Sequence, residues 1–176
     1  MSHMTQNGRV PPIVSIVGRS DSGKTTLLER LIPELRGRGY RVGTIKHHAH
    51  PGFEVDKPGK DTWRHAQAGA EAVALVAPGK MFLLRRTEGE LDLGAVAAMM
   101  GEVDIVLTEG YRWADTPKVE VVRAARSREP LCTSEELVAL VTDLPLEMGV
   151  PRFDLEEVEG LADLLERRFL RSQEEG

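Results

Sequence analysis

Cysteine, asparagine and long apolar runs are scarce in this chain of 176 residues. The single cysteine, Cys132, has no second cysteine in the chain with which to form a disulfide. No stretch has the length and hydrophobicity of a signal peptide or a membrane span, so we expect a cytoplasmic protein without a membrane partner. The only asparagine, Asn7, is not part of an N-K-x-D sequence. The motif with which many GTPases recognise guanine is therefore excluded.

Positive charge is also in short supply. The chain has 23 Lys and Arg against 28 Asp and Glu, which gives a formal net charge of −5. Proteins that bind nucleic-acid backbones need a broad positive field, so we expect no nucleic-acid partner. Hydrophobic residues make up 41% of the chain, a share that is typical of a globular protein.

The length and the hydrophobic pattern predict a single domain over residues 10–170. Residues 1–9 begin with Met1-Ser2-His3-Met4, which is typical of a cloning remnant, and we expect them to be a disordered lead. Residues 171–176 are mostly charged or polar, and we expect them to be a frayed tail.

The most informative motif is G-x-x-x-x-G-K-T at residues 18–25, between an apolar run and a helical pattern. Such a loop surrounds phosphate with backbone N–H groups, and the start of the following helix adds a positive dipole end. We expect Lys24 to reach the terminal phosphates and the Thr25 hydroxyl to bind Mg²⁺. The predicted nucleotide-binding residues here are Gly18, Ser20, Asp21, Ser22, Gly23, Lys24, Thr25 and Thr26.

Apolar runs alternate with helical segments along the chain, which predicts an α/β fold of the P-loop NTPase type in three layers. We expect helices from Thr26, over 61–68 with Asp61 as its cap, over 91–100, and at the C-terminus from Val158. Two runs joined at Pro78-Gly79 should pair antiparallel, which would make a mostly parallel sheet mixed. The expected strands are 13–17, 41–46, 72–76, 81–84, 105–108, 118–122 and 137–142.

A Mg²⁺-nucleotide site also needs a carboxylate at the end of a buried strand. Glu109 directly follows the apolar strand 105–108 and is the first choice, although an exposed loop glutamate is the alternative. Asp56, in the sequence Asp56-Lys57-Pro58-Gly59, is the second. We expect it to approach the metal or the attacking water from a loop, unless it is merely a loop charge. Lys24 and Asp56 are the residues expected to take part in catalysis.

Asp143 ends the strand 137–142 and is the best-placed carboxylate to accept hydrogen bonds from guanine. It would equally well begin the turn Asp143-Leu144-Pro145.

Three of the five histidines, at positions 47, 48 and 50, suggest a metal site, but neighbouring strand residues point to opposite faces and no cysteine is nearby. An anion-contacting loop is the favoured interpretation, since Lys46, Lys57 and Lys60 add positive charge to this region. Trp63 lies on an expected amphipathic helix, and we expect its side chain either to pack into the protein core or to form a stacking surface.

Several motifs in one order resemble the MobB family over roughly residues 11–170. The P-loop alone is shared by many unrelated activities, whereas the segment from Asp56 to Thr62 together with that from Leu107 to Tyr111 is far more specific. The matching segments, in chain order, are Gly18 to Thr25, Lys46-His47-His48, Asp56-Lys57-Pro58-Gly59-Lys60-Asp61-Thr62, Ala68-Gly69-Ala70, Leu107-Thr108-Glu109-Gly110-Tyr111 and Lys118-Val119-Glu120-Val121-Val122-Arg123.

The resemblance implies a GTP-binding, weakly hydrolysing adaptor that assists a MobA-type guanylyltransferase in attaching GMP to molybdopterin. By the same resemblance, Gly23, Lys24 and Thr25 would bind phosphates and Mg²⁺, Glu109 would be the strand-end acid, and Asp56 would belong to a nucleotide-responsive loop. The basic loop of residues 47–60 would face molybdopterin or the partner enzyme. Relatedness to dimeric P-loop GTPases implies a homodimer.

Two other functions are consistent with the same motifs. An ATP-dependent small-molecule kinase would use the P-loop together with an arginine-bearing lid, for which Arg123, Arg126 and Arg128 are available. A nickel-handling GTPase of metallocentre assembly would use the histidines, although the N-K-x-D motif and the cysteines expected of it are missing.

Overall fold

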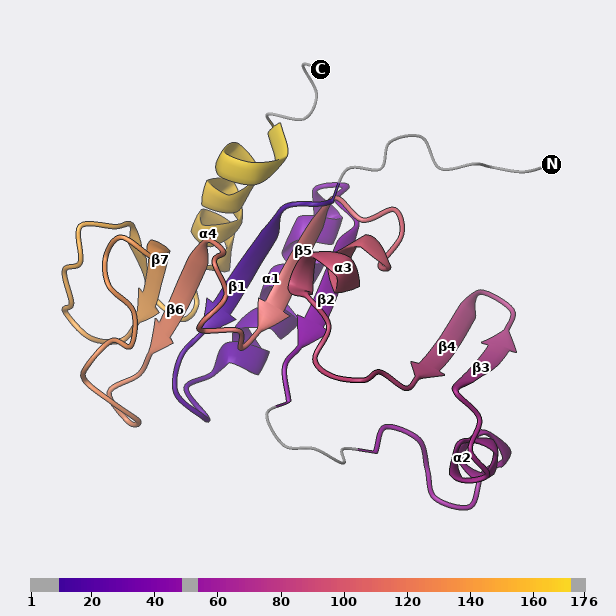
Figure 1. The fold of residues 1–176 in the computed structure, drawn as a ribbon. Helices are drawn as coiled ribbons and strands as arrows, with labels where there is room; N and C mark the ends of the chain where they lie inside the picture. Colours follow the sequence, from indigo (N-terminus) through magenta and orange to yellow (C-terminus); the bar gives the residue numbers. More distant parts are fainter. Residues whose placement is uncertain (1–9, 49–53, 172–176) are drawn as a thin grey trace. The chain divides into compact units, whose positions relative to one another are not determined.

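The computed structural model describes residues 10–48 and 54–171, and its contacts divide the chain into two compact units (Figure 1). The first unit contains the described residues up to His47 and from Leu93 onwards, and the second spans His48–Asp92. The single domain expected over residues 10–170 stays a prediction.

The first unit is built on a six-stranded sheet in the order β2-β5-β1-β6-β7-β8, and every neighbouring pair is parallel. All strands thus end at one edge, where loops carry ligand-binding residues in folds of this class. The predicted α/β fold is confirmed. The strands are β1 (Ile13–Val17), β2 (Val42–Lys46), β5 (Ile105–Glu109), β6 (Lys118–Val122), β7 (Leu137–Thr142) and β8 (Arg152–Phe153).

Helices cover both faces of this sheet (Figure 1). α1 (Lys24–Gly37) and α4 (Val158–Leu165), which continues into the π-helical turn η1 (Glu166–Leu170), share one core with the sheet. α3 (Leu93–Ala98) packs with residues of β2 and β5 in a separate cluster. Because parallel strands covered on both faces need apolar side chains throughout, β7 is buried along its whole length.

The second unit consists of α2 (Asp61–Gln67) and a hairpin of β3 (Ala72–Ala77) and β4 (Lys80–Arg85). The antiparallel pairing expected around Pro78-Gly79 is present. These two strands form a sheet of their own, so the main sheet is wholly parallel and not mixed. The expected cap of α2 is displaced by one residue, since Lys60 occupies that position and Asp61 is the first helical residue. No helix in the described ranges is long and apolar enough to cross a membrane.

Candidate nucleotide and magnesium site

The loop of residues 18–23 joins β1 to α1 at the carboxyl edge of the sheet. Gly18 and Gly23 have φ values of +143° and +100°, a region that favours glycine. A Cβ at Gly18 would lie 2.4 Å from the backbone oxygen of Val121, so no side chain fits there. Asp21 also has a positive φ, of 56°, which aspartate tolerates better than most residues. The backbone therefore has the tight, glycine-dependent path that a phosphate-binding loop requires.

Lys24 lies at the start of α1 and its side chain folds back over the loop. Its Nζ donates hydrogen bonds to the carbonyl oxygens of Gly18 at 3.0 Å and Arg19 at 2.7 Å. Burial lowers the pKa of Lys24, and the nearby carboxylates of Glu109 and Asp21 oppose that shift. The ammonium group is thus held over the loop, close to the place where a phosphate chain would lie.

Thr25 and Glu109, which the sequence predicts as magnesium ligands, meet in the structure. Thr25 Oγ1 lies 3.0 Å from both carboxylate oxygens of Glu109, which ends β5 next to β1. Lys46 Nζ, at the end of β2, lies 3.1 Å from Glu109 Oε1. A hydroxyl and a carboxylate are oxygen donors of the kind that Mg²⁺ prefers, and the remaining positions around the ion would be filled by water and phosphate. The residues present therefore fit a magnesium ion.

A cleft of about 540 Å³ lies along this edge. It is lined by Ser20, Asp21, Gly23, Lys24, Thr25, Thr26, Lys46, His47, Glu109, Gly110 and Arg123. Ser22, in contrast, is turned inward and buried. The structure thus brings most of the predicted P-loop residues together around one polar cleft, where a triphosphate and a divalent cation would find opposite charges.

Asp143 and Asp56, two further predicted site residues, are not among the residues that line this cleft. Asp143 follows β7, at the same edge of the sheet, and its Oδ1 accepts a hydrogen bond of 2.7 Å from the backbone N–H of Ala124. Its role in base recognition stays a prediction. Asp56 belongs to the second unit, where Oδ1 accepts from the backbone N–H of Lys57 at 2.8 Å. Its approach to the metal or to water likewise stays a prediction.

The first of the three histidines is engaged with aromatic rings. His47 makes edge-on contacts with Tyr111 at 5.0 Å and Trp113 at 4.7 Å between ring centroids. His50 lies outside the described residues. Across residues 10–48 and 54–171, no three His, Cys, Asp or Glu side chains are grouped so as to hold a metal ion. The rings of Tyr111 and Trp113 give His47 a packing role beside the cleft.

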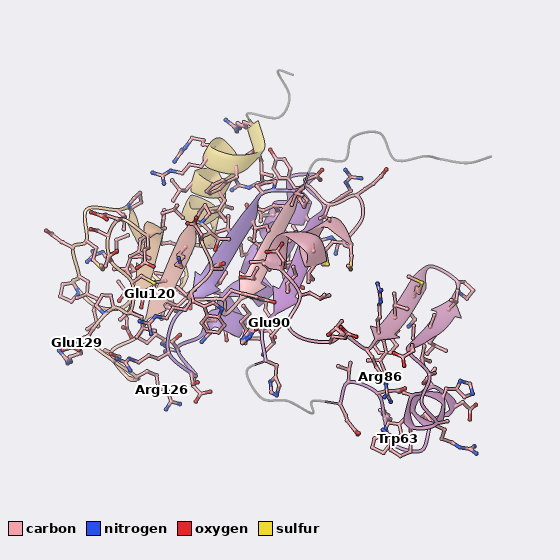
Figure 2. All side chains as sticks on the ribbon, viewed as in Figure 1. Trp63, Arg86, Glu90, Glu120, Arg126 and Glu129 are labelled. Carbon is pink, nitrogen blue, oxygen red and sulfur yellow. The ribbon has the colours of Figure 1, made fainter. Side chains whose placement is uncertain are left out.

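The second unit has a cavity of its own, of about 410 Å³. Trp63 of α2 lines it with Val55 and Leu84, and the indole Nε1 donates to Glu54 at 3.4 Å. Trp63 and Arg86 are labelled in Figure 2 beside α2 and the hairpin. The tryptophan is therefore partly buried, between the two alternatives expected for it.

Sequence reasoning missed two buried charges on β6. Lys118 Nζ donates to the carbonyl oxygen of Ala114 at 2.8 Å and pairs with Glu136 at 3.4 Å. Glu120, labelled in Figure 2, is 1% exposed and accepts the backbone N–H groups of Leu131 at 2.6 Å and Cys132 at 3.0 Å. Charged residues inside an otherwise apolar strand are the signal that could have found them, since such groups are rarely buried without partners.

The parallel sheet, the glycine loop between β1 and α1 and the acid at the end of β5 together define a protein of the P-loop NTPase fold class. A family model described as "Molybdopterin guanine dinucleotide synthesis protein B" matches residues 13–143. This chain belongs to that family, MobB.

Relatives and solved structures agree with this assignment. The molybdopterin-guanine dinucleotide biosynthesis adapter protein of Escherichia coli (strain K12) is 38% identical over 160 residues, 88% of this chain and 91% of that protein. Its Haemophilus influenzae counterpart is 36% identical over 157 residues and covers 88% of each chain. A crystal structure of Bacillus subtilis MobB superposes with a TM-score of 0.70 at 27% identity, covering 90% of this chain and 98% of that one. A crystal structure of molybdopterin-guanine biosynthesis protein B gives 0.69 at 32% identity, with 88% and 97% covered.

Proposed function

We propose that this chain is a GTP-binding adaptor in the synthesis of molybdopterin guanine dinucleotide, acting in the cytoplasm beside a MobA-type guanylyltransferase. The observation that carries the proposal is the meeting of Thr25 and Glu109 at the head of an intact phosphate-binding loop. The pathway is proposed from the similarity of this chain to molybdopterin-guanine dinucleotide biosynthesis adapter proteins.

In this proposal, Lys24, Thr25, Glu109 and Lys46 act together on Mg²⁺ and GTP. The backbone N–H groups of the loop and the Lys24 ammonium bind phosphate oxygens, replacing the carbonyl contacts that Lys24 now makes. Thr25 and Glu109 hold Mg²⁺, directly or through its water molecules, and the ion supplies charge neutralisation of the phosphates. Lys46 would hold the Glu109 carboxylate in place beside Thr25 through their ion pair.

Hydrolysis by this site should be slow. No glutamine lines the described part of the cleft, so the usual side chain for orienting an attacking water is missing there. Asp56 is the residue that we propose for this task, carried by a loop of the second unit. Slow turnover suits an adaptor that delivers GTP to another enzyme, since the nucleotide must survive until the transfer.

Guanine recognition is proposed for Asp143, because this chain lacks the N-K-x-D motif. One carboxylate oxygen is held by the N–H of Ala124, which fixes the side chain at the same edge of the sheet as the P-loop. The other oxygen would accept from the N1–H or the amino group of guanine. Molybdopterin, an anion, is proposed to contact the basic loop of residues 47–60.

A homodimer is the proposed assembly, and the hairpin is its proposed interface. One face of β3 and β4 carries Val76, Met81 and Leu83, which are 72%, 66% and 55% exposed. Isolated two-stranded hairpins are only marginally stable in water, and apolar side chains gathered on one face favour a partner surface. A second copy of this chain would present the same face and bury both.

A reconstituted transfer reaction tests the function. It contains molybdopterin on a purified guanylyltransferase, GTP, Mg²⁺ and either this chain or its Lys24→Ala variant. We expect the wild-type chain to raise the yield of dinucleotide severalfold and the variant to have no effect. No stimulation by the wild-type chain would contradict the adaptor function, whereas equal stimulation by both would show that nucleotide binding is not needed for it.

A further inference from the structure

Arg123 lies against the P-loop from the side opposite β5. It follows β6 directly, and β6 and β5 flank β1 on its two sides. A Cβ built on Gly23 would lie 3.6 Å from Arg123 Cδ and 3.8 Å from one guanidinium nitrogen. The side chain also lines the cleft that contains Lys24 and Glu109. A guanidinium group is therefore in place beside the loop that would surround the phosphates.

The guanidinium of Arg123 is short of partners within the described residues. Its Nε is buried and makes no hydrogen bond there, and no ion pair of the described residues includes it. Two other arginines of the first unit, by contrast, are paired with carboxylates: Arg38 lies 2.6 Å from Asp163, and Arg41 lies 3.0 Å from Asp104. A buried guanidinium N–H without an acceptor is unfavourable. Arg123 therefore lacks the acceptor that the protein provides for Arg38 and Arg41.

The two carboxylates that line the cleft with Arg123 are already occupied. Glu109 faces Thr25 and Lys46, on the other side of the loop. Asp21 lies 3.6 Å from Arg126, the exposed arginine labelled in Figure 2. The positive charge of Arg123 beside an anion-binding loop thus has no matching negative charge among these groups.

The backbone around Arg123 is held in place, so that its side chain is presented from a fixed point. The carbonyl oxygen of Arg123 accepts hydrogen bonds of 2.9 Å from the N–H groups of Arg126 and Ser127. The next residue, Ala124, donates to Asp143 at 2.7 Å. The backbone at Arg123 therefore loses little freedom when the side chain binds an anion, because its ordering has already occurred.

We propose that Arg123 is a second cationic phosphate-binding residue of this site, donating to a non-bridging oxygen of the nucleotide's phosphate chain from the Gly23 side. The proposal rests on the nucleotide site described above. Lys24 and Arg123 would then hold the phosphate chain of the nucleotide between them. The magnesium ligands would lie on the side of the loop away from Arg123. A guanidinium suits this task because its planar N–H groups match phosphate oxygens.

Calorimetric titrations with Mg²⁺-GTP and with inorganic tripolyphosphate test the proposal. The proteins are the wild type, Arg123→Ala, Arg123→Lys and a control, Arg128→Ala, which removes an exposed arginine of the same loop. Loss of a charge-assisted hydrogen bond should weaken the binding of both ligands by about 10- to 100-fold in Arg123→Ala. Arg128→Ala should stay within about twofold, and Arg123→Lys should regain part of the affinity because it keeps the charge.

The outcomes separate this proposal from the nucleotide site itself. If the wild type binds neither ligand, the site fails and Arg123 has no ligand to bind. If the wild type and Arg128→Ala bind while Arg123→Ala binds equally well, the role of Arg123 is overturned and the site stands. If Arg123→Ala and Arg123→Lys lose affinity equally and both unfold at lower temperature than Arg128→Ala, Arg123 packs the loop, and the phosphate-binding role is overturned as well.

Discussion

Glu120 shows how a buried charge can stabilise a loop without taking part in chemistry. Its carboxylate lies in the middle of β6 and accepts two backbone N–H groups, those of Leu131 and Cys132. Both donors belong to the loop between β6 and β7, so the contact ties this loop to the sheet. A charge that receives two hydrogen bonds is tolerated inside a protein, and its removal leaves two donors unpaired.

We therefore expect Glu120→Ala to lower the free energy of unfolding by about 2–4 kcal/mol, since two buried N–H groups lose their acceptor. Urea denaturation measures this. Glu147→Ala, a substitution of a glutamate from outside this contact, should change the stability by less than about 0.5 kcal/mol. An equally small change in Glu120→Ala would contradict the structural role.

The thiol of Cys132 reports on the same contact. Burial and the neighbouring Glu120 charge raise its pKa to about 12. At pH 8 the thiolate is therefore almost absent, and iodoacetamide should modify the folded chain on the order of 1000-fold more slowly than the unfolded chain, whose thiol has a pKa near 8.5. The rate should rise as the pH approaches 12, and it should rise at pH 8 in Glu120→Ala. Fast modification of the folded wild type would contradict this.

The sequence predicted the charges of the P-loop but not those of β6, and the reason is physical. Lys24 and Thr25 belong to a motif in which spacing alone fixes the chemistry. Glu120 and Lys118 depend on partners at Leu131 and Ala114, whose proximity is created only by the path of the chain. From the sequence, the only task suggested for the Arg123 side chain is that of a lid arginine. Its proximity to Gly23 is hidden because the two residues lie 100 positions apart in the sequence.

At the scale of elements, the magnesium site depends on the junction of α1 with the end of β5. Thr25 is in the first turn of the helix, and Glu109 is the last residue of the strand. The two side chains meet because β1 and β5 pair in parallel, in a register that aligns Ile16 with Glu109. Metal binding should therefore require both elements.

We expect Glu109→Gln to remove the dependence of GTP affinity on Mg²⁺, because a neutral amide holds the ion and its waters less well than a carboxylate. In the wild type, Mg²⁺ should increase the affinity by about tenfold or more. Titration with GTP in Mg²⁺ and in EDTA measures the difference. Glu102→Gln, which changes a glutamate before the amino end of β5, should retain the wild-type dependence. The same dependence in Glu109→Gln would refute this ligand.

Most strands were predictable because a parallel sheet covered on both faces needs continuous apolar runs. The runs of β6 and β7 have the predicted bounds. The short β8 was missed, since its two residues, Arg152 and Phe153, form no run. The hairpin was predicted as a pair, but its separation from the main sheet depends on strand order, which local patterns do not specify.

At the scale of the whole molecule, the exposed face of the hairpin predicts self-association. Val76 and Met81 are directly opposite one another on β3 and β4. Replacing Met81 with Glu should weaken a dimer by on the order of 100-fold or more, because the carboxylate would be buried without a partner. Sedimentation equilibrium measures this for a chain of 19.4 kDa. The control Lys80→Glu changes an exposed residue of the same strand. A wild type that is monomeric at all concentrations would contradict the dimer.

Calorimetric titration of the purified chain with GTP and with ATP, each with Mg²⁺, measures whether the P-loop cleft binds the nucleotide that the adaptor function needs. We predict that GTP binds about tenfold more tightly than ATP or better, and that Lys24→Ala, which removes a charged phosphate contact but no core packing, abolishes binding while unfolding at the wild-type temperature. A preference for ATP would contradict the adaptor account and favour a small-molecule kinase. Unaltered affinity in Lys24→Ala would contradict the site itself.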